Sequence, residues 1–476
     1  MLTCPKEISF SSLDKKKSFS SSNYSEIFIP NKNQQPLKKF LDDEKPFITG
    51  IEPGSNAYVK YSDIYFLRNS CIDLFNLTQQ NDKLIYLNPR HTYSNELVNE
   101  DVLLCKDANI GDACLFLDEQ KKCFISSGVV KLNFKNDLHK FYCLAMMRDS
   151  YFRDQLYALT PKGSTIKHAG DKFLQCKLPV ITKEIEAYLD EIKNLILNLA
   201  YCESISYQKM NQIEQLFLDE LKINEAKINH ETSFDSVIEV LRLDSGMFSE
   251  EVKKIQYAVE NYINGSLSLE DFGFRLKRGP NLAKRDLGRS VQSNQYRDNF
   301  NVLIYPSDIS DNGYVLKQSY LGARNEVSFM TKGDILFSAE GTVGKTFIVC
   351  DELLKFTTNF HGIILSKIET DIPFEKSIIL GCYLIFLRKF GFFEKISVGG
   401  QGGSFAIQYW DYLKVPNIPK DLYDQFTNLY YISDCNLNPS KFDEISLQKS
   451  GIFNLNNFRI VCNERLKAIV DSIKSA

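Results

Sequence analysis

The chain has 476 residues, of which 43% are hydrophobic and 25% charged, and its formal net charge is −3. A chain of this length is expected to form more than one domain, and the composition is ordinary for a globular protein with hydrophobic cores. Global disorder is therefore excluded. Because the net charge is mildly acidic, any contact with nucleic acid must come from local basic surfaces.

Apolar and metal-binding residues exclude further classes of protein. The longest apolar run, 378–387, is shorter than the roughly 20 residues needed to cross a bilayer, and a buried helix fits it better. The first thirty residues contain no apolar stretch of signal-peptide type. The twelve cysteines form no Cys-x-x-Cys pair, and none of the five histidines has the spacing of a zinc protease. We therefore predict a cytoplasmic protein with no membrane contact, disulfide framework or metal site.

A duplication organises the chain. The segment 101–111 (DVLLCKDANIG) aligns without a gap on 334–344 (DILFSAEGTVG), 233 residues later. Each reads as a strand, a tight turn with glycine and a returning strand. A second set of residues repeats with a spacing of 240: Gly163-Ser164, Asp171 and Pro179 with Gly403-Ser404, Asp411 and Pro419. The serine of each set is predicted to cap a short helix that leads through a strand to proline.

A helical segment follows each copy. After Pro179 apolar residues recur every three or four positions, at Ile185, Leu189, Ile192, Ile196 and Leu199, with Leu216 and Leu221 beyond them. After Pro419 a similar stripe begins, and the residues of this region are Leu422, Phe426, Leu429, Phe458, Val461, Ala468, Ile469 and Ile473. Such stripes suit long helices that pack along each other. The alternative is that they are ordinary core helices of each domain.

The predicted fold class is α+β, with two similar mixed α/β domains separated by long helices that form an antiparallel, coiled-coil-like spacer. We place the first domain at 1–179 and the second at 271–418. The first helical spacer, with an extra helical insert, is placed at 180–270 and the second at 419–476.

The sequence resembles the specificity subunits of type I restriction-modification enzymes. The second copy carries most of the resemblance, in 332–345 (KGDILFSAEGTVGK), 358–365 (TNFHGIIL), 402–408 (GGSFAIQ) and 415–419 (VPNIP). In the first copy it lies in 163–166 (GSTI) and in Leu178-Pro179. Together these segments and their order cover roughly two thirds of the chain. The chain departs from the family in the helical insert at 230–270 and in Asn436, Asn438 and Pro439, where a continuous helix is expected.

This resemblance implies a non-catalytic subunit with two target recognition domains. Each would read one half of a split site on double-stranded DNA, with the helices as a ruler between them. The subunit would dock methyltransferase (modification) subunits and, through them, a restriction motor subunit. No cofactor would belong to this chain, because S-adenosylmethionine, ATP and magnesium would be bound by the partners.

The predicted DNA-binding residues fall into two groups, and the alternative for both is an ordinary solvated loop. Cations neutralise phosphates, whereas arginine, glutamine and asparagine can also read base edges. The first group opens the second domain around Gly279-Pro280, and it consists of Arg275, Lys277, Arg278, Lys284, Arg285, Arg289, Gln292, Asn294, Gln295 and Arg297. The second group belongs to the two Gly-Ser turns, where a helix N-terminus could bind phosphate, and it consists of Lys162, Ser164, Lys167, His168 and Ser404.

Residues 339–346 (AEGTVGKT) differ from a phosphate-binding P-loop only at the first glycine. A P-loop must open a helix, whereas the β-branched and aromatic continuation TFIVCD predicts a strand. Asp112 and Ala113 also stand in the first copy where Lys345 and Thr346 stand in the second. A P-loop nucleotide-binding protein is therefore the weaker alternative, and the recognition subunit of a related restriction or phage-defence system is another. No methyltransferase motif occurs, and no catalytic residue is predicted.

Overall fold

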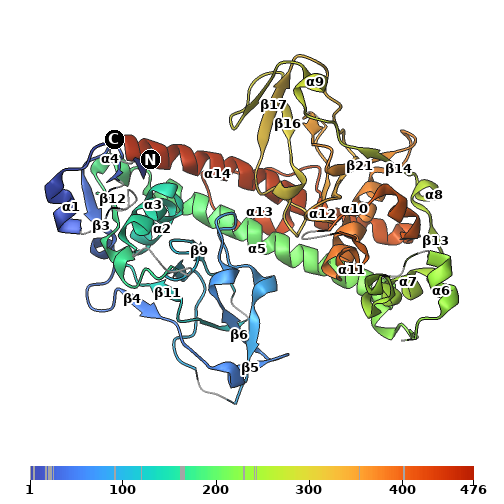
Figure 1. Cartoon of the computed structure of the whole chain (residues 1–476), viewed down its shortest axis with the longest axis horizontal. Helices are drawn as coiled ribbons and strands as arrows, with labels where there is room; N and C mark the ends of the chain where they lie inside the picture. The colour runs from blue at the N-terminus through green and yellow to red at the C-terminus, as the bar shows by residue number, and fades with distance from the viewer. Residues whose placement is uncertain are drawn as a thin grey trace. The chain divides into compact units, whose positions relative to one another are not determined.

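The computed structural model describes residues 2–3, 6–16, 19, 24, 26–90, 93–118, 121–160, 167–228, 231–240, 242, 244–352, 354–399 and 403–476. The chain divides into two compact units (Figure 1). Unit 1 comprises Met1–Ser204, Asn436–Gln448 and Asn457–Ala476, and unit 2 comprises Ile205–Cys435 and Lys449–Asn456. Two of the four boundaries between the units fall inside long helices, α5 (Leu189–Glu220) and α14 (Ile452–Ser475), so each unit contains part of both.

Unit 1 contains two four-stranded sheets. The first is antiparallel, with the order β4 (Phe47–Thr49), β11 (Val129–Leu132), β8 (Val102–Cys105), β9 (Ala113–Leu115). The second has the order β5 (Tyr58–Val59), β7 (Ile85–Leu87), β6 (Ile64–Leu67), β10 (Lys122–Ile125), and only β6 and β10 are parallel. Two shorter pairs are β3 (Gln34–Pro36) with β12 (Lys177–Pro179) and β1 (Leu2–Thr3) with β2 (Glu26–Ile27).

Unit 2 repeats this arrangement. Its antiparallel sheet has the order β14 (Phe274–Arg278), β21 (Gly362–Lys367), β18 (Ile335–Ser338), β19 (Thr346–Ile348). Its mixed sheet has the order β15 (Ser290–Ser293), β17 (Ser319–Ala323), β16 (Asn301–Leu303), β20 (Phe356–Thr357), and only β16 and β20 are parallel. Strand β13 (Ser266–Leu267) pairs with β22 (Val415–Pro416). Strand order and direction match unit 1 throughout, which confirms the predicted pair of similar α/β domains.

The repeated hairpin is formed by β8 and β9 in unit 1 and by β18 and β19 in unit 2. Its turn needs glycine, because Gly111 and Gly344 have φ angles of 88° and 87°, which side-chain-bearing residues rarely adopt. A Cβ at Gly111 would also lie 2.9 Å from Cγ of Arg153, and one at Gly344 would lie 2.8 Å from Cδ2 of Phe393. The glycine signal in the sequence therefore has the same cause in both copies.

The strand registers correct the second part of the predicted alignment. The β3–β12 pair of unit 1 corresponds to the β13–β22 pair of unit 2. In this comparison Leu178 is equivalent to Val415, and Pro179 is equivalent to Pro416. The predicted match of Pro179 with Pro419 is therefore wrong by three residues. The spacing of this second set differs from the prediction because no strand register is visible in the sequence.

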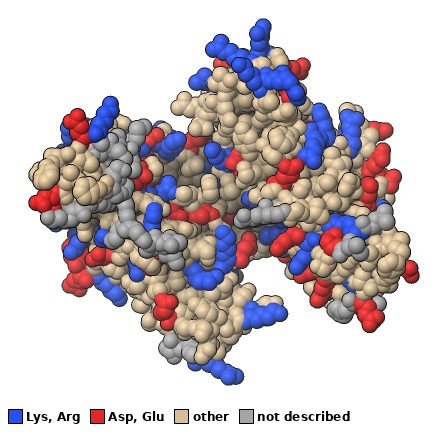
Figure 2. Space-filling view, in the orientation of Figure 1, with Lys and Arg blue, Asp and Glu red and all other residues tan. Residues whose placement is uncertain are grey.

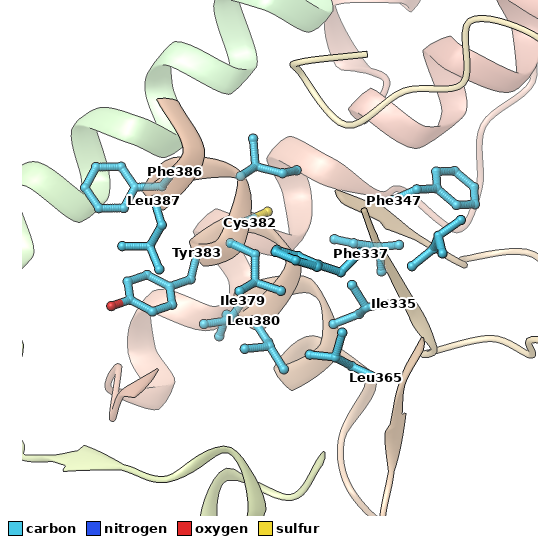
Figure 3. Close-up of a cluster of buried hydrophobic side chains, with 14 of the residues drawn as sticks. Ile335, Phe337, Phe347, Leu365, Ile379, Leu380, Cys382, Tyr383, Phe386 and Leu387 are labelled. Carbon is cyan, nitrogen blue, oxygen red and sulfur yellow. The ribbon is translucent and has the colours of Figure 1, made fainter. Parts of the chain in front are cut away.

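Helices cover the antiparallel sheet of each unit. In unit 1 these are α2 (Asp137–Arg148) and α3 (Ser150–Leu159), and in unit 2 they are α10 (Phe374–Lys389) and α11 (Phe392–Ile396). Residues 378–387 of α10 are all buried, so the prediction of a buried helix for this apolar run is confirmed. Figure 3 shows Ile379, Leu380 and Cys382 of this helix facing strand residues Ile335, Phe337 and Leu365. No helix among the described residues is long and apolar enough to span a membrane.

The remaining helices are short. Unit 1 contains α1 (Phe10–Lys16), α4 (Lys183–Glu186) and, by the division above, most of α13 (Glu444–Lys449). Unit 2 contains α6 (Phe234–Val240), α7 (Glu250–Glu260), α8 (Leu269–Phe272), α9 (Lys284–Leu287) and α12 (Tyr423–Tyr430). None of the eleven cysteines in the described part of the chain forms a disulfide.

Helices α5 and α14 carry most of the predicted stripes, whereas Ile185 lies in α4 and Phe426 and Leu429 lie in α12. All five predicted positions from Ile185 to Leu199 are buried, whereas Val461 is 50% exposed and Ala468 is also exposed, so these two were wrongly included. Within unit 1 the two helices run antiparallel, because Glu191 pairs with Arg465 at 2.6 Å while Glu203, further along α5, faces Arg459, earlier on α14. Within unit 2, Ile213 and Phe217 of α5 share a core with Ile452 of α14.

One buried position of the α5 seam is charged. Glu203 lies in register with Ile196 and Leu189, seven and fourteen residues earlier, yet its side chain is only 4% exposed. Its Oε2 accepts hydrogen bonds from the backbone N of Leu77 at 2.7 Å and of Thr78 at 2.9 Å, and from Oγ1 of Thr78 at 3.1 Å. Its Oε1 lies 3.8 Å from Nη1 of Arg459. Burial raises the pKa of Glu203, and Arg459 and these hydrogen bonds oppose that rise. Glu203 therefore fastens the loop before β7 to the helix pair.

Candidate nucleic-acid interface

The predicted basic stretch of the second domain lies along one exposed side of unit 2. It runs through β14, the short helix α9, the edge strand β15 and the loop that leads to β16. On β14 two cations are held by neighbours: Lys277 Nζ donates to Ser328 Oγ at 2.8 Å, and Arg278 lies 3.0 Å from Glu340. Burial raises the pKa of Glu340, but hydrogen bonds from His361 and Arg278 outweigh it and leave that pKa below its usual value. Glu340 is therefore a charged partner that orients Arg278.

The cations around α9 are more exposed, and we call Lys284, Arg285, Arg289 and Arg324 the basic tip. Helix α9 is anchored by Leu287, which is buried with Leu303 and Leu321. Arg285 is 85% exposed, and within the described part of the chain its ion-pair partner is Asp286 at 3.3 Å. Among the described residues, the side chains of Lys284, Arg289 and Arg324 have no hydrogen-bond or ion-pair partner. Figure 2 shows lysines and arginines gathered at the end of unit 2 where Figure 1 places α9.

Arg324 was not predicted from the sequence. It follows β17 and is brought to α9 by backbone hydrogen bonds, from Arg324 N to Arg289 O at 2.9 Å and from Asn325 N to Leu287 O at 3.1 Å. Because this contact depends on the pairing of β15 with β17, no local pattern in the sequence could have indicated it.

The predicted amide residues lie next to the basic tip. On β15, Gln292 Nε2 donates to Ser319 Oγ at 3.2 Å and its Oε1 accepts from Tyr305 OH at 3.2 Å. Asn294 and Gln295 are exposed in the following turn, and Arg297 lies with its guanidinium 5.7 Å from the centre of the Phe300 ring. Amides of this kind can pair bidentately with adenine, and arginine with guanine. The stretch therefore combines exposed cations with amides that can form hydrogen bonds.

The predicted group at the Gly-Ser turns is only partly assembled. Lys162 and Ser164 lie outside the described residues. Lys167 places its Nζ 3.8 Å from the centre of the Tyr157 ring, and His168 Nδ1 lies 2.9 Å from Asp107. The helix that follows is a single turn at Lys172–Gln175. A phosphate site at a helix N-terminus therefore stays a prediction here, with Lys167 and His168 as its described members.

Ser404 does not cap a helix as predicted, and its contact with DNA stays a prediction. The short 3-10 helix Ile407–Tyr412 has Ala406 as its N-cap and no side-chain capping bond. Ser404 instead forms an isolated bridge with Glu340, where His168 forms one with Asp107 in the other copy. Ser404 therefore corresponds to His168 and not to Ser164. Trp410 is buried against Phe337 and Phe405, as expected for a packing residue.

The P-loop-like segment lacks the required context. Its last residue, Thr346, begins strand β19 and no helix follows, which confirms the predicted strand. Lys345 Nζ lies 4.0 Å from Asp311. No group of three or more metal-binding side chains occurs within the described ranges.

Asp112, which stands where Lys345 stands in the second copy, is expected to make stability depend on pH. Burial raises its pKa from 3.8 to about 6, against the opposing effects of Arg153 and Arg148. The folded state favours the protonated carboxyl group of Asp112. The stability that this protonation contributes is fully present below the pKa that Asp112 has in the unfolded state, and it is lost as the pH rises through the pKa that Asp112 has in the folded state. As the pH rises from about 4 to about 6, the wild type should therefore lose stability that the Asp112→Asn variant keeps. Denaturation curves at several pH values measure this difference, and parallel pH dependences would contradict it.

Fold comparison finds similar solved structures, although no family model and no curated protein matches the sequence. The type I restriction-modification S subunit from M. genitalium is 11% identical, with 93% of this chain and 92% of that chain covered and a TM-score of 0.39. The HsdS subunit from Thermoanaerobacter tengcongensis is 13% identical, with coverages of 94% and 97% and a TM-score of 0.27. A chain from a study of assembly and conformational transition of the type I R-M system is 12% identical, with the same coverages and a TM-score of 0.28. These structures are of the family that the sequence motifs resemble.

Proposed function

We propose that this chain is the sequence-specific DNA-binding subunit of a type I restriction-modification complex. Each copy of the duplicated domain would read one half of a bipartite site on double-stranded DNA. The observation that carries the proposal is that one α/β domain occurs twice with the same strand order, and that one copy has exposed cations and amides on an edge strand and in the segments directly before and after it. Cations position a protein on the backbone and amides and arginines read bases, so the surface has both functions of a specific DNA reader.

The helices α5 and α14 would set the distance between the two half-sites. In the proposed complex the chain itself is not catalytic, and its partners are the modification subunits and the restriction motor subunit. S-adenosylmethionine, ATP and magnesium would act on those partners. The four domain ranges predicted from the sequence, 1–179, 180–270, 271–418 and 419–476, belong to this proposal.

Methylome sequencing of a host with and without the gene tests the proposal directly. A methylated motif that depends on the gene and consists of two short sequences with a fixed gap is the expected result. Footprinting of the purified complex should then protect both half-sites. A single contiguous motif, or no change in methylation together with no specific binding, would contradict it.

A second candidate is the recognition subunit of a related restriction or phage-defence system. The helical insert with α6 and α7 favours it, because this insert departs from the pattern of the type I family. Affinity purification of the chain from its host distinguishes the two, because the enzymes that accompany it identify the system.

Charge reversal on the basic tip should weaken DNA binding. The double variant Arg285→Glu and Arg289→Glu is expected to lose roughly ten- to a hundredfold in affinity at physiological salt and to reduce the salt dependence, because each lost phosphate contact lowers the slope by about one. The matched control is Lys38→Glu with Lys39→Glu, which makes the same change in net charge at exposed positions of unit 1. Titration of a labelled duplex by fluorescence anisotropy measures both variants. Equal losses in both would mean that only the overall charge matters.

A further inference from the structure

The strand registers identify equivalent residues in the two mixed sheets. In unit 1, Tyr86 of β7 lies opposite Tyr65 of β6, whose parallel partner on β10 is Cys123. In unit 2, Tyr320 of β17 lies opposite Val302 of β16, whose parallel partner on β20 is Phe356. Phe356 follows Cys123 by the same 233 residues that relate the repeated hairpins. Tyr86 and Tyr320 therefore occupy the same position.

An exposed tyrosine packs on each of these two. Tyr61 is 74% exposed and its ring centre lies 6.0 Å from that of Tyr86, while Tyr296 is 59% exposed and lies 5.5 Å from Tyr320. Both come from the loop between the first two strands of the sheet. A ring that is held in place by another ring but left open to solvent is suited to stack on a base or to bind a phosphate through its hydroxyl. The tyrosine pairs mark the same face of both copies, which we call the tyrosine face.

The charge beside this face differs between the copies. Gly50 and Gly279 are equivalent, because a Cβ on them would lie 2.2 and 2.1 Å from the carbonyl oxygens of Ser126 and Asn359, which are again 233 residues apart. The next glycine with a positive φ is Gly54 in unit 1 and Gly288 in unit 2. Three residues separate the glycines in unit 1 and eight in unit 2, and the longer segment contains α9 with Lys284 and Arg285.

The registers extend this comparison to the strands. Ser55 stands in unit 1 where Arg289 stands in unit 2. Unit 1 therefore lacks counterparts of three of the four cations of the basic tip, and its one counterpart is Arg90, which is equivalent to Arg324. Tyr58 takes the place of Gln292 and Lys60 that of Asn294. Lys60 lies 5.5 Å from the centre of the Tyr61 ring.

The tyrosine face of unit 1 has one more tyrosine than that of unit 2. Tyr65 lies where unit 2 has Val302, with its ring 5.3 Å from that of Tyr86. Tyr58 lies opposite Leu87, so its side chain points to the other side of the sheet and does not belong to the tyrosine face. Stacking and hydrogen bonds from neutral hydroxyls release no counterions, so their contribution to binding depends little on salt, whereas phosphate contacts by cations depend on it strongly.

We infer that the two copies hold their half-sites by different chemistry. The copy in unit 2 supplies the salt-dependent attraction to the phosphate backbone through the basic tip, and the copy in unit 1 binds through its tyrosine face with little dependence on salt. This inference rests on the proposed function and deepens it. In this view unit 2 binds DNA of any sequence through the phosphate backbone. Unit 1 adds affinity chiefly at its own half-site.

The test uses the full chain in the complex in which it is isolated, with a duplex that carries the methylated motif and a scrambled duplex as reference. Affinity is measured over a range of KCl concentrations for two pairs of neutralised cations, Lys284→Gln with Arg285→Gln in unit 2 and Lys60→Gln with Arg90→Gln in unit 1. The unit 2 pair should lower the slope of log affinity against log salt by about two, and the unit 1 pair by less than about one. Tyr61→Ala and, separately, Tyr61→Leu, which keeps an apolar side chain but removes the ring, should each lower affinity for the motif about tenfold, without a change in slope.

If the wild type prefers the motif to the scrambled duplex, two results would overturn the inference. One is that both cation variants lower the slope of log affinity against log salt equally, and the other is that the tyrosine substitutions leave the affinity for the motif unchanged. If the wild-type complex does not distinguish the motif from the scrambled duplex, the proposed function itself is overturned. The exposed positions of these side chains make misfolding of the variants a minor concern, and thermal unfolding of each variant checks it.

Discussion

Replacing Glu203 by alanine is expected to lower the free energy of unfolding by about 3–5 kcal/mol, the usual cost of removing one partner from a buried charged network. The carboxylate accepts three hydrogen bonds from Leu77 and Thr78 and faces Arg459, whose side chain is only 6% exposed. Without it, two backbone N–H groups and a guanidinium stay buried with fewer partners. Glu203→Gln keeps one accepting oxygen and should lose less.

Urea denaturation of the full chain measures this effect, followed through a probe in unit 1. The matched control is Glu191→Ala on the same helix, because Glu191 pairs with Arg465 at a partly exposed site. Pairs of that kind contribute about 0–1 kcal/mol. Similar losses in the two variants would mean that Glu203 acts as an ordinary surface charge.

Alanine at Gly279 or at Gly50 is expected to cost about 3 kcal/mol or more, at the upper end of the range for overpacking. The added Cβ would lie 2.1 Å from the carbonyl oxygen of Asn359 in one case and 2.2 Å from that of Ser126 in the other, and a backbone atom cannot rotate away. Both glycines end the first strand of the antiparallel sheet. Gly279→Ala should therefore also displace the segment that carries α9 and weaken DNA binding.

Gly265→Ala is the control for this clash. Gly265 has a φ of 75° but nothing within 4 Å of its Cβ position, so alanine there should cost only the conformational penalty of about 1–2 kcal/mol. Denaturation curves compare the three variants. A loss at Gly279 no larger than at Gly265 would show that the neighbouring strand yields easily.

The sequence predicts those parts of the fold whose signals are local. The hairpins are visible because acid, aliphatic strand and glycine follow one another within eleven residues, and the physical need for glycine is the same at Gly111 and Gly344. The burial of α5 is visible because its apolar residues repeat with the helical period. The strand after Lys345 is visible because β-branched and aromatic residues favour it.

The parts that were missed depend on contacts between distant residues. Arg324 joins the basic tip through the β15–β17 pairing, and Ser404 lies opposite Glu340 instead of capping a helix. Val461 and Ala468 fit an apolar pattern but lie on the exposed side of α14, where Cys462 and Leu466 are buried. The side of a helix that is buried is decided by the elements that pack against it. When apolar residues lie on two sides of a helix, its own sequence does not show which of the two sides is buried.

The discontinuous construction of the units limits how the chain can be divided. Unit 1 draws on three separate stretches and unit 2 on two, and the core of unit 2 includes Phe217 of α5 and Ile452 of α14. A fragment cut at the boundaries 271 and 418 would lack both of these residues and strand β13, so it should expose apolar surface and aggregate when expressed alone. A single proteolytic nick, by contrast, should leave the two products associated until a denaturant separates them.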